Sequence, residues 1–129
     1  MNRFKQWQQP AFDKNDMTKW NWICQHRDKF QLGKNTDIGA FTYINAKYGV
    51  IIEDEVQIGS HCAIYSDNTI DNIQGKIIIK QGARIGSHTV ILPGVTIGEN
   101  ALIGAHSLVK QNVGPNEIVG GVPARLIKK

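Results

Sequence analysis

Three of the four histidines, His61, His88 and His106, recur at one position of a repeating sequence pattern. Each follows an isoleucine by three residues, and each is preceded by a serine or an alanine. A neutral imidazole accepts a proton close to neutral pH, which makes histidine the most frequent general base in proteins. A repeat that brings successive units into register would place these rings on one outward column, about 5 Å apart.

We expect His88 to be the general base, because it adjoins Ser87 and comes in the first turn after an irregular stretch, Tyr65–Lys76. His61 is the first alternative. Asp67, within the irregular stretch, is the second, since a carboxylate can orient an imidazole or accept a proton itself. The competing interpretation is that the three histidines form only a surface ladder or a contact between subunits.

The two cysteines, Cys24 and Cys62, form no CxxC pair and fit a reducing compartment. Cys62 falls on an inward position of the repeat, so we interpret it as a core residue. No serine has an evident activating partner in the sequence. These observations predict a reaction without a covalent enzyme intermediate.

The repeat that positions the histidines has a period of six and is clearest over residues 79–113. The leading aliphatic residues are Ile79, Ile85, Ile91, Ile97, Ile103 and Val109, and small residues follow each by four positions at Ala83, Thr89, Val95, Ala101, Ser107 and Val113. An α-helix would need apolar residues three or four apart. A period of six instead predicts a coil with three short strands and about 18 residues per turn.

The repeat predicts an all-β chain with about four triangular turns, a cap segment at 1–31, the coil at 32–113 and an extended tail at 114–129. A bulge near Lys47–Val50 absorbs two extra residues, and Tyr65–Lys76 holds a three-residue excursion. Breaks in a repeat usually line a binding face. We expect Trp20 and Trp22 to pack in the cap rather than to bind a ligand.

Length and composition limit the possible functions. The 129 residues suit one domain, and the net charge of +4 comes without an arginine-rich run or an aromatic stripe for nucleic acid. No apolar run approaches the roughly 20 residues that cross a bilayer. The N-terminus lacks the apolar core of a signal peptide, so we expect a cytoplasmic protein.

The run IGSHTVILPGVTIGENALIGAHSLV and the closing GGVPARLI resemble the hexapeptide-repeat acyltransferases over about residues 32–127. The similarity is greatest to sugar-acetylating enzymes, such as the galactoside and maltose O-acetyltransferases and polysaccharide-tailoring enzymes. It implies a left-handed parallel β-helix and a homotrimer. It further implies an acetyltransferase that uses acetyl-CoA as acyl donor and acts on a hydroxyl or amino group of a sugar or nucleotide-sugar.

The resemblance also implies residue roles. Positions that contact acetyl-CoA in the sugar acetyltransferases are matched here by Ser87, Ala105, Lys110 and Gln111, and the basic residues that meet the nucleotide phosphates by Arg125 and Lys128. His106 stands where the family commonly has glycine, so it is expected to line the cofactor groove. No metal ligand is implied.

One difference from the sugar acetyltransferases leaves other functions open. The galactoside and maltose enzymes carry a histidine in the loop before their final turns, whereas Tyr65–Lys76 contains none. A non-catalytic binding or scaffold trimer is therefore the second hypothesis. A metal-dependent hydratase similar to the γ-class carbonic anhydrases is the third, although no two histidines here show that family's spacing of five.

Overall fold

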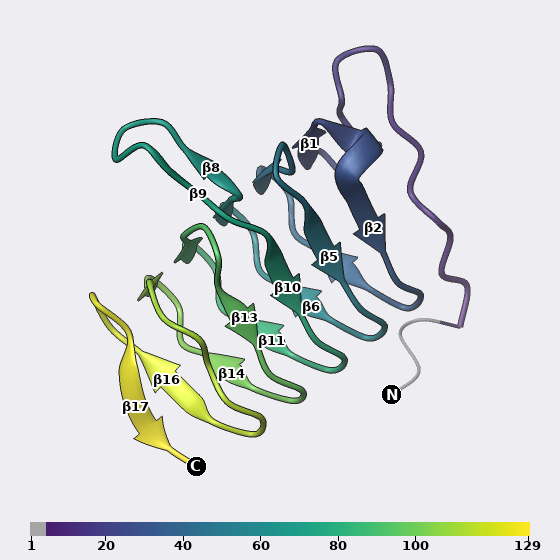
Figure 1. Ribbon diagram of the computed structural model, residues 1–129. Coiled ribbons are helices and arrows are strands. Elements are labelled where there is room, and N and C mark those ends of the chain that lie inside the picture. The colour runs from purple at the N-terminus through teal and green to yellow at the C-terminus, as the bar shows by residue number, and fades with distance from the viewer. Residues whose placement is uncertain (1–4) are drawn as a thin grey trace.

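The computed structural model describes residues 5–129, so the first four residues of the predicted cap segment lie outside the described part. The chain winds into a parallel β-helix of about five turns, seen from the side in Figure 1. The predicted all-β coil is confirmed. Within residues 5–129 the one helical element is the 3₁₀ turn η1, Arg27–Lys29. No helix in that range is long and apolar enough to span a membrane.

Three parallel sheets form the three sides of the coil. Sheet A runs in the order β1 (Ile23–Gln25), β4 (Tyr43–Asn45), β7 (Ala63–Tyr65), β12 (Val90–Ile91) and β15 (Leu108–Val109). Sheet B contains β2 (Phe30–Leu32), β5 (Val50–Ile52), β10 (Ile77–Ile79) and β13 (Thr96–Ile97). Sheet C contains β3 (Asp37–Ile38), β6 (Gln57–Ile58), β11 (Arg84–Ile85), β14 (Leu102–Ile103), β16 (Ile118–Gly120) and, antiparallel at its edge, β17 (Arg125–Lys128).

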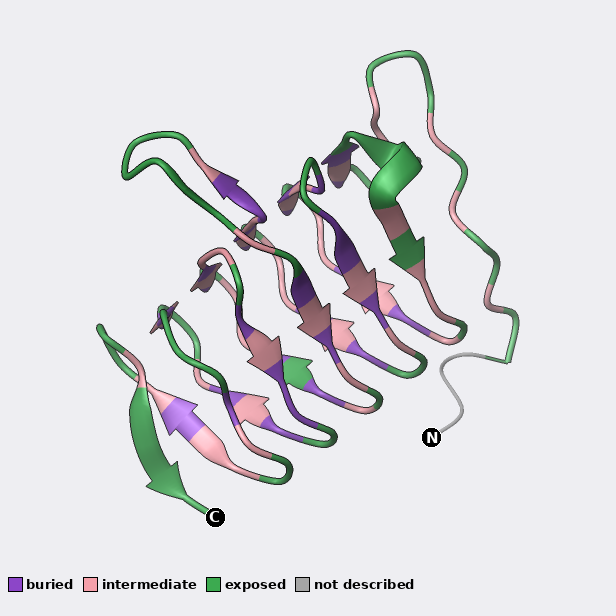
Figure 2. Ribbon diagram, in the orientation of Figure 1, coloured by how far each residue is buried: buried purple, intermediate pink, exposed green. Residues whose placement is uncertain are grey.

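The inside of the coil is filled as the period of six predicts. All leading aliphatic residues from Ile38 to Val109 are buried, and so are their small partners. The register is in phase from turn to turn: Ile44 pairs with Ile64, and Ile85 with Ile103. Because each inward position stacks on a like side chain, the apolar columns bury their surface continuously, which is the main favourable term in folding. Figure 2 shows these buried positions alternating with partly exposed ones along the strands.

The number of turns was predicted too low. The coil has about five turns rather than four, because β1, within the predicted cap segment, already pairs in parallel with β4, and β16, within the predicted tail, adds a further side to sheet C. Val113 bridges to Ile97, and Val119 of β16 is buried in the same column as Ile103. The sequence pattern is interrupted by a short corner, since Val113 takes the leading position only four residues after Val109, and the period of six then resumes from Val113 to Val119.

The N-terminal cap closes the first turn with aromatic side chains. Trp22 is buried, and its ring meets Phe12 edge-on at 5.4 Å and lies 6.2 Å from Phe30. The packing predicted for Trp22 is therefore confirmed. Trp20 differs, because 41% of its surface stays exposed.

The coil is interrupted where the sequence departs from the repeat. The stretch after Tyr65 forms an antiparallel hairpin of β8 (Asp67–Asn68) and β9 (Ile73–Gln74). Figure 1 shows this hairpin projecting from the corner between sheets A and B. Its root packs on the next turn, since a Cβ on Gly75 would lie 2.8 Å from the Gly94 nitrogen. The excursion predicted within Tyr65–Lys76 is thus a separate structural element.

Candidate functional site

The histidine corner is the edge at which the chain turns from sheet C to sheet A, at residues 59–61, 86–88 and 104–106. His61, His88 and His106 adopt the left-handed backbone conformation there, with φ of 60°, 59° and 59°. Gly59 and Gly86 precede the turn because a side chain would meet the backbone of the next turn at 2.6 and 2.5 Å. The same three-residue bend is therefore repeated, and each bend projects a histidine outward.

The three imidazoles form a parallel stack at this corner. His61 and His88 have ring centroids 4.7 Å apart and an interplanar angle of 4°, and His88 and His106 are 4.7 Å apart at 5°. All three residues are exposed. The backbone fixes the spacing, since the His88 amide donates to the Ser60 carbonyl at 3.0 Å and the His106 amide to the Ser87 carbonyl at 2.9 Å. The predicted outward column is confirmed, and its catalytic role stays a prediction.

Sequence reasoning missed one member of this column. Phe41 occupies the same position one turn earlier, with φ of 66° and its ring 5.2 Å from that of His61. The sequence spacing could have revealed this position, because Phe41 follows Ile38 by three residues, just as each histidine follows its isoleucine. The hydroxyl of Ser60 also belongs to this corner, because it lies within hydrogen-bond distance, 3.0 Å, of Nδ1 of His61.

Backbone amides line the histidine corner. Within residues 5–129 the amides of Ser87 and Ala105 donate to no other protein group. Unpaired donors in successive turns form a row that can pair with the carbonyl groups of an extended ligand. Ser87 and Ala105 are thus brought together with His88 and His106, as the sequence predicts.

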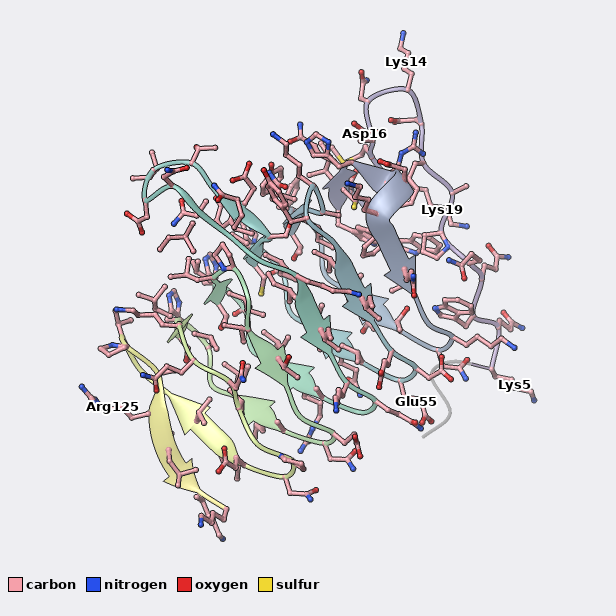
Figure 3. The ribbon with its side chains drawn as sticks, in the orientation of Figure 1. Lys5, Lys14, Asp16, Lys19, Glu55 and Arg125 are labelled. Atoms are coloured by element: carbon pink, nitrogen blue, oxygen red, sulfur yellow. The ribbon has the colours of Figure 1, made fainter. Side chains whose placement is uncertain are left out.

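Lys110, Gln111 and Arg125 come together at the C-terminal end of the coil. They line one cavity of about 270 Å³, which Glu117 also borders. Arg125 begins β17, and Figure 3 shows it at the opposite end of the molecule from Lys19. Lys128 lies at the other end of β17 and does not line this cavity.

Asp67 lies at the root of the hairpin and is only 8% exposed. Its carboxylate accepts a hydrogen bond from Nε2 of Gln74 at 3.3 Å and lies 4.0 Å from Nζ of Lys47. His61 precedes strand β7 and Asp67 follows it, so the two side chains stand beyond opposite ends of one strand. Asp67 therefore orients no histidine of its own chain, contrary to one of the roles considered for it.

Neither cysteine is an available nucleophile. Burial raises the pKa of the Cys62 thiol, whose sulfur lies 3.3 Å from the Gly86 carbonyl oxygen. Burial, helped by the nearby Asp16 carboxylate, raises the pKa of Cys24 to about 12. Both thiols stay protonated at neutral pH, and only the thiolate is strongly nucleophilic. The interpretation of Cys62 as a core residue agrees with its burial.

The stacked histidines do not form a metal centre. Parallel rings 4.7 Å apart face one another, so their nitrogen atoms do not converge on one point. In the described part of the chain, no three His, Cys, Asp or Glu side chains are grouped to hold an ion.

The sequence is similar to a known repeat model and to known acetyltransferases. Residues 76–111 match the model for the bacterial transferase hexapeptide (six repeats). The galactoside O-acetyltransferase of Escherichia coli K12 is 34% identical over 116 residues, which cover 78% of this chain and 57% of the relative. The chain thus spans little more than half the length of that curated relative.

Solved structures of acyltransferases have a similar fold. A hexapeptide-repeat acetyltransferase from Vibrio cholerae, complexed with acetyl coenzyme A, matches with a TM-score of 0.77 and 29% identity, over 84% of this chain and 64% of that one. AntD, an N-acyltransferase from Bacillus cereus in complex with dTDP and 3-hydroxybutyryl-CoA, matches with a TM-score of 0.75 and 26% identity, over 87% and 78%. The chain is therefore a hexapeptide-repeat protein, and galactoside O-acetyltransferases and related acetyltransferases are its homologues.

Proposed function

We propose that this protein is an acetyltransferase that moves an acetyl group from acetyl-CoA to a hydroxyl or amino group of a sugar or nucleotide-sugar. The observation that carries the proposal is the histidine corner, where exposed imidazoles adjoin a row of free backbone amides. The names of the homologues support the same chemistry, since they include galactoside O-acetyltransferase and an N-acyltransferase bound to an acyl-CoA.

The residues present fit acetyl-CoA. The amides of Ser87 and Ala105 can pair with the amide carbonyls of its pantetheine arm, and His106 lies beside them. At the end of the coil, Lys110 and Arg125 supply cations for its phosphates, Arg by charge-assisted hydrogen bonds. Acetyl-CoA contributes an activated thioester carbonyl for attack.

His88 acts as the general base. A ring nitrogen of His88 takes the proton from the acceptor hydroxyl or amine as its oxygen or nitrogen bonds to the acetyl carbon. The bond from that carbon to sulfur then breaks, and the proton ends on the departing thiol. Transfer is direct, because the buried cysteine thiols are protonated and provide no acyl carrier. His61 and Asp67 are the alternative bases.

We further propose that the protein works as a cytoplasmic homotrimer. In such an assembly the histidine corner of one subunit would adjoin a neighbour, as is typical of the family. The hairpin would then be available to shape an acceptor site that one chain alone leaves open.

The proposal is tested by following thiol release from acetyl-CoA in the presence of galactosides, maltose and amino sugars, with mass spectrometry of the products. A mass gain of one acetyl group on an acceptor, dependent on the protein, is the expected result. Binding of acetyl-CoA without transfer across the whole panel would instead support a non-catalytic trimer. Stoichiometric zinc in the purified protein would support a metal-dependent hydratase.

A further inference from the structure

A second cavity lies at the N-terminal end of the coil, at the opposite end from Arg125 (Figure 3). It has a volume of about 350 Å³, within the ~300–1,000 Å³ typical of small-molecule sites. Its walls come from residues 6–10, from Lys19–Trp22 and from Thr36–Ile38 at the edge of sheet C. None of the predicted donor-binding residues lines it.

Three tryptophans, Trp7, Trp20 and Trp22, give the cavity an aromatic lining. Trp7 is held in place, because its Nε1 donates to the Thr36 carbonyl at 2.8 Å. Trp20 is 41% exposed although it is among the largest apolar side chains. The ammonium of Lys19 lies 4.7 Å from the Trp20 ring centre and donates to Oε1 of Gln8 at 3.1 Å. Rigid indole rings thus stand beside amide and ammonium groups.

This combination suits a neutral sugar. A pyranose offers an apolar C–H face that packs on an aromatic ring, while its hydroxyls pair with amide groups such as those of Gln6 and Gln8. A phosphorylated ligand fits less well. Among the lining residues, all within the described part of the chain, Lys19 is the one cation and Asp37 adds a carboxylate.

The cavity and the histidine corner are connected by a path along one edge of the coil. Asn21 takes the position of Phe41 one turn earlier, since it shares the left-handed backbone conformation of the column and its carbonyl accepts the Phe41 amide at 2.7 Å. Trp20 directly precedes Asn21, so it stands beside the column in the turn before Phe41. The Phe41 ring is 63% exposed and adjoins His61. With turns stacked roughly 4.8 Å apart, the turn that holds Trp20 lies about 14 Å from the turn that holds His88. Exposed rings therefore occur in every turn from the cavity to the proposed base.

We propose that this cavity binds one unit of an extended neutral hexose oligosaccharide, which runs over Phe41 and places a later unit at His88. The inference rests on the proposed function and narrows its acceptor to a glycan chain. The cavity acts as an anchoring subsite, distant from the bond that forms.

Calorimetric titration of the protein without cofactor tests the subsite separately from catalysis. The probes are maltotetraose and β-1,4-galactotetraose, with glucose and galactose as single-unit controls. We expect at least one tetraose to bind at least tenfold more tightly than its monosaccharide. Trp20→Ala should remove that advantage, and Phe41→Ala should reduce it. Ile127→Ala is the control, because Ile127 is 68% exposed on β17, at the opposite end of the coil from the cavity.

The outcomes separate the two proposals. Equal affinity for tetraoses and monosaccharides, or unchanged tetraose binding by a folded Trp20→Ala variant, would overturn the subsite. Acetyl transfer to monosaccharides could still proceed in that case. Tetraose binding that depends on Trp20, without any acetyl transfer, would instead support the subsite and contradict the proposed enzyme.

Discussion

Two corners of the same coil differ in how the chain uses them. At the histidine corner every turn makes the same bend, and the three imidazoles stack at 4.7 Å. At the hairpin corner, between sheets A and B, each turn is different. In successive turns the hairpin corner consists of residues 46–49 with the exposed Tyr48, the β8–β9 hairpin, a Pro93-Gly94 turn, and a turn that contains Lys110 and Gln111.

The contrast shows which function each corner suits. A regular corner presents identical backbone donors and side chains at equal intervals, which fits the long, linear arm of the acyl donor. An irregular corner can change one turn without disturbing the stacked core, because insertions there leave the inward columns in register. In the proposed enzyme, the hairpin corner could therefore vary to suit different acceptors while the histidine corner stays unchanged.

The strongest test removes the proposed base. His88→Ala should lower kcat by the 10²- to 10⁴-fold that is typical of losing a general base, with little change in KM for acetyl-CoA. Steady-state kinetics with the acceptor found above measure both values. His26→Ala is the control, since His26 lies at the N-terminal end outside the stack. Undiminished turnover in the His88 variant would exclude it as the base.

Removing the cation at the end of the coil should affect donor binding instead. Arg125→Ala should raise KM for acetyl-CoA roughly tenfold or more, because a hydrogen bond to a charged group contributes about 1.5–3 kcal/mol. Lys128→Ala should change KM much less, since Lys128 lies outside the cavity that Arg125 lines. Equal effects of the two substitutions would show that the phosphates extend along β17.

The hairpin corner can be tested at its tip. Ile70 is 90% exposed, so Ile70→Ser removes little packing within its own chain. We expect kcat/KM for the acceptor to fall about fivefold while the free energy of unfolding changes by less than about 0.5 kcal/mol. Urea unfolding and kinetics on one preparation supply both numbers. Unchanged acceptor kinetics would remove the hairpin tip from the acceptor site.

Both corners depend on a folded coil, and the buried thiol at its N-terminal end makes that fold sensitive to alkali. The pKa of Cys24 is about 12 in the folded chain against an ordinary 9.0, so its stabilising contribution is complete below pH 9 and is lost between pH 9 and 12. Relative to Cys24→Ala, the wild-type free energy of unfolding should fall by about 1.4 kcal/mol per pH unit above pH 9. Parallel pH dependences of the two proteins would contradict this.

Much of the fold could be predicted because one physical rule repeats. A period of six fixes which side chains face inward, and the stack of His61, His88 and His106 follows from register alone. The fifth turn was missed because the corner between Val109 and Val113 is two residues short, which hides Val113 and Val119 as leading residues, and because β1 lies before the repeat.

The position of Asp67 and the N-terminal cavity could not be predicted, because they depend on contacts between residues that no local sequence pattern specifies. The position of Asp67 relative to His61 follows from the length of strand β7, which sets them apart rather than together. The N-terminal cavity needs Trp7 and Trp20 to meet the edge of sheet C, far away in sequence. The proposed acceptor site would likewise depend on side chains outside the repeat.

The return of β17 along β16 has a consequence for solubility. A coil of stacked strands ends in unpaired backbone groups, onto which another coil could add and start a filament. Here β17 runs antiparallel on the last strand of sheet C, and the Leu108 amide and carbonyl are taken by Gly121 and Ala124. These pairings occupy the outer edge of β16 and the backbone of Leu108 within the chain, so a second coil cannot add directly at those positions.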